Sequence, residues 1–274
     1  MSSIILIRGG GDLASGVAVR LHRAHMRGLI TELFEPLVVR RTVAFAEVVH
    51  SGQIEIEGVK GYLAANLDQA QAIMQQGDVA VRIDPHGECI ETLKPLVVVD
   101  ARMTKKAVTP SIDIAPMVVG LGPGFTAGKN CSAVIETKRG HALGRVIWKG
   151  SAEEDTGVPG SVQQHNIDRV LRAPADGELI SHAEIGQKLK KGASIAQVNG
   201  QLVVAPFEGL LRGLLHPGMQ VTKGMKIGDL DPRNDPELTR HISDKALAVG
   251  GGVLEAILSR SYIREKLWDD DNSR

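Results

Sequence analysis

The sequence predicts an α/β protein in three parts: an N-terminal α/β domain, a module of short β-strands and a partly helical tail. Three observations lead to this prediction. Short apolar runs alternate with helix-period segments in the first half, a pattern of residues recurs 32 positions later in the second half, and a helical pattern follows it. The chain has 274 residues, of which 43% are hydrophobic. This length suits about two domains with cores of their own.

Charge and composition narrow the class of partner. Lys and Arg together number 32, as do Asp and Glu, and there are only four Phe, two Trp and two Tyr. A neutral chain with few aromatic rings is a poor match for nucleic acid. Two cysteines make no disulfide framework, and no apolar run approaches the roughly 18 residues that span a bilayer. We expect a cytoplasmic protein that binds neither nucleic acid nor a membrane.

The first elements are a strand, a turn, a helix and a second strand. The apolar run 4–7 is typical of a strand buried on both faces. After a glycine-rich turn, an apolar stripe with helical spacing predicts a helix that ends at Gly28, because glycine tolerates left-handed geometry. Residues 29–34 then predict the second strand.

The same alternation continues along the N-terminal half. A helix is predicted over 67–76 with Gly77 at its end, followed by strands over 79–83, 96–99 and 117–121. Strands separated by helices favour parallel βαβ units. We therefore assign residues 1–126 to one Rossmann-like domain.

The turn after the first strand has the spacing of a dinucleotide-binding motif. Gly9, Gly10, Gly11 and Asp12 open the pattern G-x-G-x-x-A between strand and helix, where glycine lets the backbone approach a pyrophosphate at the helix start. Glu32, 21 residues after Gly11, is placed to bind ribose hydroxyls. These five residues are the first part of the predicted cofactor site. A turn that only connects the two elements is the alternative.

A second polar group follows the strand at 117–121. Gly122 and Gly124 form a turn that we expect to line the same crevice and to complete the cofactor site. Cys131 is the candidate nucleophile or sulfur ligand, with Arg139 and His141 as groups that favour its thiolate. A small buried cysteine without chemistry is the alternative.

Other polar residues are less specific. Asp84 and Asp100 end predicted strands, where an acid either faces a ligand or caps the next turn. His22 and His25 have helical spacing but no evident third ligand, so no metal site is predicted.

The second half contains an internal repeat. Residues 173–179 recur, 32 positions later, at 205–211, with Asn199 and Gly200 between the copies as a tight hairpin. The repeat resembles the barrel-sandwich fold of biotinyl and lipoyl carrier domains. Those domains carry the modified lysine on the joining hairpin, whereas residues 197–201 contain no lysine. We therefore predict a barrel-sandwich-like module without the carrier function.

The remaining boundaries follow from this repeat. The module covers 166–232, and residues 127–165 form a connecting β segment. The tail, 233–274, begins a helical pattern that is interrupted by three successive glycines at 250–252. Such a triplet indicates either a break in the helix or very close backbone packing.

Several long segments together are similar to one family. Residues 7–16 (IRGGGDLASG), 136–141 (ETKRGH), 228–233 (GDLDPR) and 243–245 (SDK) resemble the YqeB family, over nearly the full chain. That family is associated with selenium-dependent molybdenum hydroxylases. The resemblance implies an accessory role in maturing or inserting the selenium-containing molybdenum cofactor.

The sequence leads to one principal hypothesis about function and to two alternatives. The leading hypothesis is a maturation factor that binds NAD(P), another nucleotide or molybdopterin, and that has a molybdenum hydroxylase or a cofactor-supply protein as partner. One alternative is an NAD(P)-dependent oxidoreductase, and another is a noncatalytic adaptor that docks through the β module. Whether the chain is an enzyme, and whether it forms a homo-oligomer, is left open by the sequence.

Overall fold

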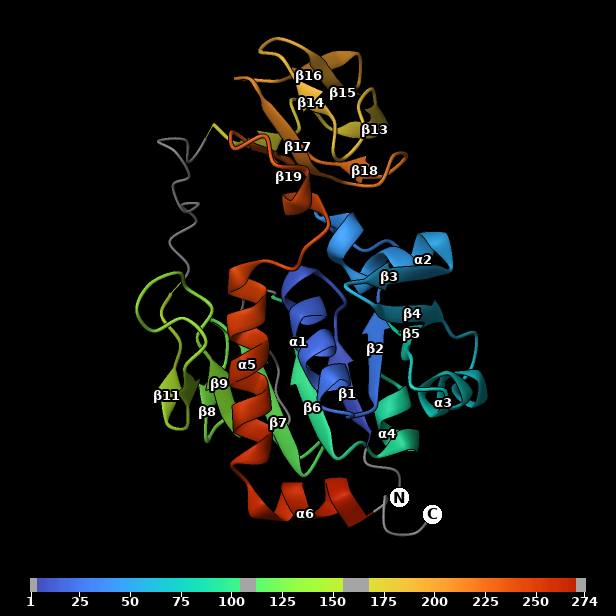
Figure 1. Cartoon of the computed structure of the whole chain (residues 1–274), viewed down its shortest axis with the longest axis vertical. Coiled ribbons are helices and arrows are strands. Elements are labelled where there is room, and N and C mark those ends of the chain that lie inside the picture. Colours follow the sequence, from blue (N-terminus) through green and yellow to red (C-terminus); the bar gives the residue numbers. More distant parts are fainter. Residues whose placement is uncertain (1–3, 104–111, 155–167, 270–274) are drawn as a thin grey trace. The chain divides into compact units, whose positions relative to one another are not determined.

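The computed structural model describes residues 4–103, 112–154 and 168–269, which form two units (Figure 1). Unit 1 comprises Met1–Pro36, Phe45–Asp155 and Ile242–Arg274, and unit 2 comprises Leu37–Ala44 and Thr156–His241. The mixed α/β class is confirmed. Both units combine separate stretches of sequence, whereas the sequence predicted contiguous domains at 1–126, 127–165, 166–232 and 233–274.

Unit 1 is built on a nine-stranded mixed sheet with the order β10-β9-β7-β6-β1-β2-β5-β4-β3. Neighbouring strands from β9 to β4 in this order run parallel, and the two outermost pairs are antiparallel. The strands are β1 (Ile5–Arg8), β2 (Gly28–Glu32), β3 (Gln53–Ile56), β4 (Val59–Leu63), β5 (Val79–Ile83), β6 (Val97–Asp100), β7 (Met117–Leu121), β9 (Ala133–Ile135) and β10 (Val146–Ile147). A separate pair joins β8 (Thr126–Ala127) and β11 (Gly150–Ser151).

Helices cover both faces of this sheet, which explains why its central strands are continuous apolar runs. On one face, side chains of β1, β2, β6 and β7 form a core with α3 (Leu67–Gln75) and α4 (Cys89–Leu93). On the other side, α1 (Asp12–Arg23) packs along α5 (Asp244–Leu258). Three short helical segments, η1 (Arg41–Val43), η2 (Phe45–Glu47) and α2 (Val48–Ser51), follow β2.

The end of α1 differs from the prediction. The helix ends at Arg23, and the left-handed residue that follows is His25, with φ 58°. Gly28 is instead the first residue of β2, paired with Ile5. The prediction that Gly28 ends the helix was therefore wrong, because the chain reverses three residues earlier than its nearest glycine.

The glycine triplet lies inside a continuous helix. α5 runs from Asp244 to Leu258, begins with Ser243 as its cap, and includes residues 250–252 without a break. A Cβ on Gly250 would lie 2.5 Å from the carbonyl oxygen of Gly16 in α1, and a Cβ on Gly252 would overlap the carbonyl oxygen of Gly144. Of the two alternatives read from the sequence, close packing is the one observed.

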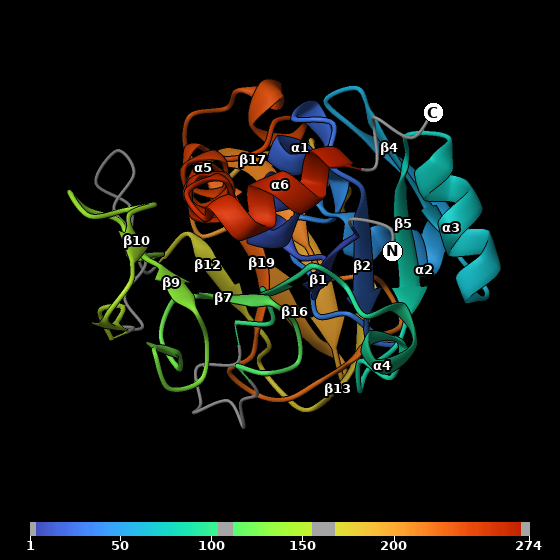
Figure 2. The ribbon, with the colours of Figure 1, turned by 90° about the horizontal axis from the view of Figure 1, so that it is seen from below.

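A second helix, α6 (Ser261–Asp269), turns away from the end of α5 (Figure 2). No single helix in the described part of the chain is long and apolar enough to cross a membrane. Within the same described residues, α5 and the first part of α6 are long and apolar enough when taken together, but they are bent by 95° at their junction.

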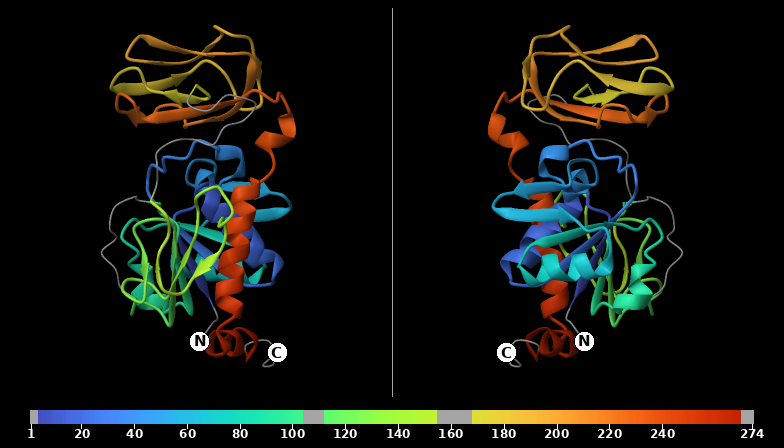
Figure 3. Two further views of the ribbon diagram at one scale, coloured as in Figure 1. Left: turned by 90° about the vertical axis from the view of Figure 1, so that its left-hand side faces the viewer. Right: turned by 90° about the vertical axis from the view of Figure 1, so that its right-hand side faces the viewer.

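Unit 2 consists of two four-stranded sheets that lie face to face (Figure 3). Their orders are β12-β19-β17-β14 and β16-β15-β13-β18, and all pairs are antiparallel. The strands are β12 (Val170–Arg172), β13 (Gly177–Ser181), β14 (Lys188–Leu189), β15 (Ser194–Val198), β16 (Gln201–Val204), β17 (Gly209–Leu214), β18 (Gln220–Val221) and β19 (Lys226–Asp231). η3 (Pro236–Thr239) follows.

The sequence repeat maps strand onto strand. The spacing of 32 positions relates β12 to β16, β13 to β17, β14 to β18 and β15 to β19. Each sheet therefore takes two strands from each copy, so neither copy forms a sheet alone. Asn199 (φ 48°) and Gly200 (φ 73°) join β15 to β16 in a two-residue hairpin, as their sequence predicts.

The segment Leu37–Ala44 belongs to unit 2, although it follows β2 directly. Arg41 Nε donates to the carbonyl oxygen of Leu214 at 2.8 Å, and Thr42 Oγ1 donates to that of Thr239 at 2.6 Å. A Cβ on Gly213 would lie 2.7 Å from the carbonyl oxygen of Val39. These two hydrogen bonds join residues 173 and 197 positions apart, which sequence patterns cannot indicate.

Candidate functional site

The predicted glycine turn lies at the carboxyl edge of the parallel strands, between β1 and α1. Gly9 has φ +90°, which favours glycine. Gly11 is the N-cap of α1 with φ −68° and ψ −173°, and among the described residues no side chain caps this helix start. The first N–H groups of a helix lack partners within the helix, so this end can receive an anion.

Two of the three glycines approach the protein's own backbone. A Cβ on Gly10 would lie 2.9 Å from the nitrogen of Ala46, and one on Gly9 would lie 3.3 Å from the carbonyl oxygen of Ala101. The N–H of Ala46 also donates to the carbonyl oxygen of Gly10 at 2.9 Å. Gly9 and Gly10 thus have a packing role, because an alanine at either position would press on neighbouring backbone atoms.

Glu32 holds the turn against the end of β2. Its Oε1 accepts the N–H of Gly10 at 2.6 Å, and its Oε2 accepts the N–H of Leu33 at 2.7 Å. Burial raises the pKa of Glu32, and the two N–H groups offset only part of this rise. The residue predicted to bind ribose therefore already bonds to the turn that was predicted to bind phosphate.

The second glycine turn lies at the same edge of the sheet. Gly122 (φ 73°) and Gly124 (φ 98°) follow β7, which is separated from β1 by β6 alone. Because the three strands are parallel, their carboxyl ends share an edge. A Cβ on Gly122 would overlap the hydroxyl of Thr137, and Asn130 Nδ2 donates to the carbonyl oxygen of Gly124 at 3.1 Å.

Charged side chains that the sequence reading missed lie at this edge. Arg8 ends β1, pairs in register with Asp100 of β6, and donates from Nη2 to the carbonyl oxygen of His86 at 3.1 Å. Arg102 binds Asp100 through both Nε, at 3.0 Å, and Nη2, at 2.6 Å. Burial, and next the charge of Arg102, lower the pKa of Arg8. The sequence did contain one indication that Arg8 belongs to this edge, namely its position directly before Gly9 of the glycine turn.

Asp84 caps the turn that leads into α4. Its carboxylate accepts the N–H groups of Gly87, Glu88 and Cys89 at 2.8–2.9 Å. Burial alone would raise the pKa of Asp84, but hydrogen bonds from Cys89 and its neighbours outweigh it and lower the pKa. Of the two roles left open for this acid, the structure describes the capping role.

The structure buries Cys131 in the apolar core of unit 1. The residue is 0% exposed and packs in the cluster that includes Val118 and Val134. Burial raises the pKa of its thiol to about 11, although backbone hydrogen bonds lower it in part. This environment favours the neutral thiol over the nucleophilic thiolate.

Arg139 and His141 lie in an exposed loop rather than beside the thiol. Arg139 forms a two-pronged ion pair with Asp244 at the start of α5, with distances of 2.7 and 2.6 Å. His141 is exposed. The buried charged residue of this segment is Glu136. Its carboxylate accepts the backbone N–H groups of Lys138, at 2.7 Å, and Glu153, at 2.8 Å.

The structure thus brings the two glycine turns and Glu32 to one sheet edge, and it places Cys131, Arg139 and His141 in different surroundings. Within the described ranges, no group of three or more His, Cys, Asp or Glu side chains is arranged to hold a metal ion.

The fold and this edge define a mixed α/β protein that carries a glycine turn at a helix start and a duplicated β module. It belongs to the YqeB family: the chain is 47% identical, over 255 residues and 93% of its length, to "Uncharacterized protein YqeB" of Escherichia coli (strain K12). The chain spans about half of that relative, since the match covers 47% of the relative's length. No family model matches the chain.

Solved structures show only slight likeness. The product-bound ectoine utilization protein EutE (DoeB) from Ruegeria pomeroyi has a TM-score of 0.23 and 14% identity, over 84% of this chain and 58% of that chain. A succinylglutamate desuccinylase/aspartoacylase from Rhodobacter sphaeroides has a TM-score of 0.29 and 10% identity, over 84% and 85% of the respective chains. Likeness at this level carries no conclusion about function.

Proposed function

We propose that this chain is an accessory protein in the maturation of a selenium-dependent molybdenum hydroxylase. In this proposal it binds the phosphate part of a nucleotide, or of a molybdopterin-type cofactor, at the glycine turn between β1 and α1. The hydroxylase link rests on the resemblance of four sequence segments to the YqeB family. The phosphate site rests on the geometry of the turn.

The observation that carries the phosphate site is the place of the turn in the sheet. Of the seven parallel strands, β4 lies beside β5 towards the edge of the sheet, and the other six, β1, β2, β5, β6, β7 and β9, counted in chain order, lie in the order 3-2-1-4-5-6. This is the order of doubly wound dinucleotide-binding sheets, in which ligands bind where the strand order reverses, beside the first strand. The order supports a Rossmann-like unit 1, and β1 is the strand at the reversal.

The helix start supports the same site. α1 is a 12-residue helix whose N-cap is Gly11, with no side-chain cap among the described residues. Its N-terminus therefore presents backbone N–H groups and the positive end of the helix dipole. Arg8 and Arg102 add positive charge at the same edge, partly balanced by Asp100.

In unit 2, the exchange of strands between two copies supports the barrel-sandwich-like assignment, and the hairpin at Asn199 and Gly200 carries no lysine for a carrier group. We propose that this module is a structural or docking part of the accessory protein.

Gly11→Ala tests the phosphate site. The backbone angles of Gly11 suit alanine, and in this proposal the added methyl group stands where a phosphate approaches the backbone. Circular dichroism of the variant checks that it is folded. Isothermal titration with NAD+, NADP+, ATP, CTP and molybdopterin should show saturable binding of at least one ligand to the native chain, with affinity reduced more than tenfold by Gly11→Ala. Gly28→Ala is the matched control, because a Cβ there would meet nothing within 4 Å.

The outcomes separate the candidate functions. Binding of none of these ligands, or equal binding by the Gly11→Ala variant, would overturn the phosphate site. Binding of NAD(P) together with a change in nicotinamide absorbance on adding a small substrate would instead establish an oxidoreductase. The accessory role predicts that a molybdenum hydroxylase purified from cells lacking this chain contains less selenium or molybdopterin than the same enzyme from cells that produce it.

A further inference from the structure

The bend that follows β2 exposes two large apolar side chains. Leu33 is 47% exposed, and Phe34 is 69% exposed, which is the highest fraction among the exposed large apolar side chains of the described residues. Phe45 and Phe125, by contrast, are buried in unit 1. The core therefore does not use the ring of Phe34, and covering this ring with another apolar surface is favourable.

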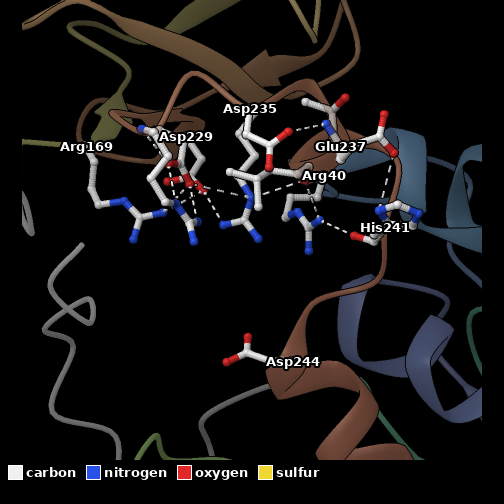
Figure 4. A network of polar contacts seen from close by, with 12 residues as sticks. Arg40, Arg169, Asp229, Asp235, Glu237, His241 and Asp244 are labelled. Carbon is white, nitrogen blue, oxygen red and sulfur yellow. Dashed lines mark hydrogen bonds and ion pairs between the residues drawn. The ribbon is translucent and has the colours of Figure 1, made fainter. Parts of the chain in front are cut away.

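The polar network of unit 2 shows the opposite situation, since its side chains bind one another or the backbone (Figure 4). Arg169 Nη2 lies 3.3 Å from Asp229 Oδ2, and Arg40 Nη2 donates to the carbonyl oxygen of His241 at 2.8 Å. These contacts stabilise unit 2 from within. The exposed ring of Phe34 has a different environment, in which a ligand can reach it.

The bend is held at both of its ends. The backbone N–H of Leu33 donates to Glu32 Oε2 at 2.7 Å. Pro36, at the other end, is buried, and a proline restricts both its own backbone and that of the residue before it. Phe34 therefore lies on a segment with little backbone freedom. Because its side chain has only two rotatable bonds, binding to its ring costs little conformational entropy.

The same bend is adjacent to the glycine turn after β1. β1 and β2 are parallel neighbours, and the N–H of Gly9 donates to the carbonyl oxygen of Thr31 at 2.7 Å. Glu32 Oε1 then accepts the N–H of Gly10 at 2.6 Å. Phe34 follows Glu32 by two residues, which is at most about 7 Å of chain. A ribose between a phosphate and a base suits such a separation.

Charge differs along this edge of the sheet. Arg8 ends β1, and Arg102 follows β6. On the β2 side, the bend carries an exposed acid, Glu35, beside its apolar residues. Arginines attract a phosphate and a carboxylate repels it, whereas an apolar surface favours an uncharged ring. The phosphate end of a ligand is thus directed towards β1 and β6, and its uncharged end towards β2.

We propose that Phe34 stacks on a planar heteroaromatic ring of the ligand whose phosphate lies at the glycine turn. This inference rests on the proposed phosphate site. It narrows the ligand to a nucleotide or a pterin phosphate, because inorganic phosphate and simple sugar phosphates have no such ring. Stacking tolerates different rings, since every base has a π-face. Phe34 is thus a specificity-determining residue that selects for a ring and not for one particular base.

Isothermal titration of the full chain with AMP and with ribose 5-phosphate tests the stacking, because AMP has the additional adenine ring. The native chain should bind AMP about fivefold to 100-fold more tightly than ribose 5-phosphate, the range expected for one stacked base. Phe34→Ala should remove this difference by weakening AMP alone, and Phe34→Leu should remove part of it. Leu202→Ala is the matched control, because Leu202 of β16 is also apolar and 56% exposed.

Phe34→Trp gives a second readout. This variant keeps an aromatic surface, so it should bind AMP at least as tightly as the native chain, and its additional tryptophan fluorescence should be quenched by AMP but not by ribose 5-phosphate. AMP, CMP and 6-hydroxymethylpterin monophosphate distinguish the sources of the ring, since the tightest of the three tells a purine, a pyrimidine or a pterin. Because Phe34 is exposed, none of these substitutions removes a core contact.

The outcomes separate this inference from the phosphate site. Equal AMP affinity of the native chain and Phe34→Ala would overturn the stacking, and the phosphate site would stand if Gly11→Ala still weakened AMP. AMP binding that depends on Phe34 but not on Gly11 would place the ring at a different site and overturn the inference as stated. Saturable binding of none of these phosphates would overturn both.

Discussion

The backbone N–H of Gly10 donates to Oε1 of Glu32 at 2.6 Å, which ties the turn after β1 to the end of β2. The opposite oxygen of the same carboxylate accepts the N–H of Leu33 at 2.7 Å. A single side chain thus sets the conformation of the segment at which we place the phosphate site. Each carboxylate oxygen accepts a different N–H group, so removing either oxygen breaks one of the two hydrogen bonds.

Glu32→Gln should lower the free energy of unfolding of unit 1 by about 1–3 kcal/mol, because glutamine has one carbonyl oxygen for the two N–H groups of Gly10 and Leu33. Urea unfolding followed by tryptophan fluorescence measures this, since both tryptophans of the chain, Trp148 and Trp268, belong to unit 1. Glu35→Gln is the control, because Glu35 is exposed and its variant should stay within about 0.5 kcal/mol of the native chain.

The same variant predicts a pH dependence. The pKa of Glu32 is raised in the folded state, so the folded chain holds the proton more tightly than the unfolded chain. The contribution of Glu32 to stability is then greatest below the ordinary glutamate pKa of about 4.3 and decreases as the pH rises through the raised pKa. The stability difference between the native chain and Glu32→Gln should narrow over this interval, and a widening difference would contradict the raised pKa.

Three neighbouring glycines of α5 should respond oppositely to alanine. Gly250→Ala and Gly252→Ala should each destabilise unit 1 by about 2 kcal/mol or more, because the added methyl groups meet the backbone of Gly16 and Gly144. Gly251→Ala should stabilise it by about 0.5–1 kcal/mol, since a Cβ there meets nothing within 4 Å and alanine favours the helix. Urea unfolding of the three variants decides this, and equal effects at all three positions would disprove the close helix crossing.

Cys131 should be unreactive in the folded chain. With a pKa of about 11, about one thiol in a thousand is ionised at pH 8, compared with roughly a quarter for an ordinary thiol. Cys89, whose pKa burial raises to about 12, should react more slowly still. Labelling with iodoacetamide, followed by peptide mass spectrometry, should modify both cysteines in urea and neither in buffer within the same time. Rapid native labelling of Cys131 alone would restore it as the candidate nucleophile.

Asp231→Asn should loosen unit 2. Burial alone would raise the pKa of Asp231, but the hydrogen bonds and charge of Arg233, with the charge of Arg212, outweigh burial and lower it. The variant removes the charge of a buried carboxylate whose partner Arg233 is 38% exposed, and we expect it to lose about 1–3 kcal/mol. Because unit 2 contains neither Trp nor Tyr, amide hydrogen exchange of β17 and β19 is the suitable measurement.

The acid response of unit 2 gives a second readout. A lowered pKa means that Asp231 stabilises unit 2 above the ordinary aspartate pKa of about 3.9, and that this stabilisation is lost as the pH falls through the lowered value. Amide protection in β19 of the native chain should fall in that range, and that of Asp231→Asn should change less. Glu178→Gln, at an exposed position of β13, should behave as the native chain.

Local sequence patterns predicted the strands that are buried along their whole length and the helix that ends at a glycine. β5, β7 and α3 have the predicted positions to within a residue, because apolar runs buried on both faces and a glycine after the helix leave few alternatives. The spacing of 32 positions predicted the β module, because both copies need glycine at the same left-handed turns. The β3–β4 hairpin was missed, since much of it is exposed and its apolar residues are few.

The candidate site was predicted less completely. The glycine turns were found because positive φ angles select a residue type that is visible in sequence. The bond from Gly10 to Glu32, the pairing of Arg8 with Asp100 and the burial of Cys131 depend on which strands become neighbours. Strand order is a property of the whole sheet, so no local pattern contains it.

The inclusion of Leu37–Ala44 in unit 2 has a consequence for the inheritance of this module. A gene fragment encoding only the residues after 155 would lack Val39, Arg41 and Thr42, whose backbone and side chains complete the packing of β17 and η3. Unit 2 therefore cannot be obtained complete from one contiguous stretch of the sequence, or released complete by a single proteolytic cut. A rearrangement that kept these contacts had to carry Leu37–Ala44 together with the segment after residue 155.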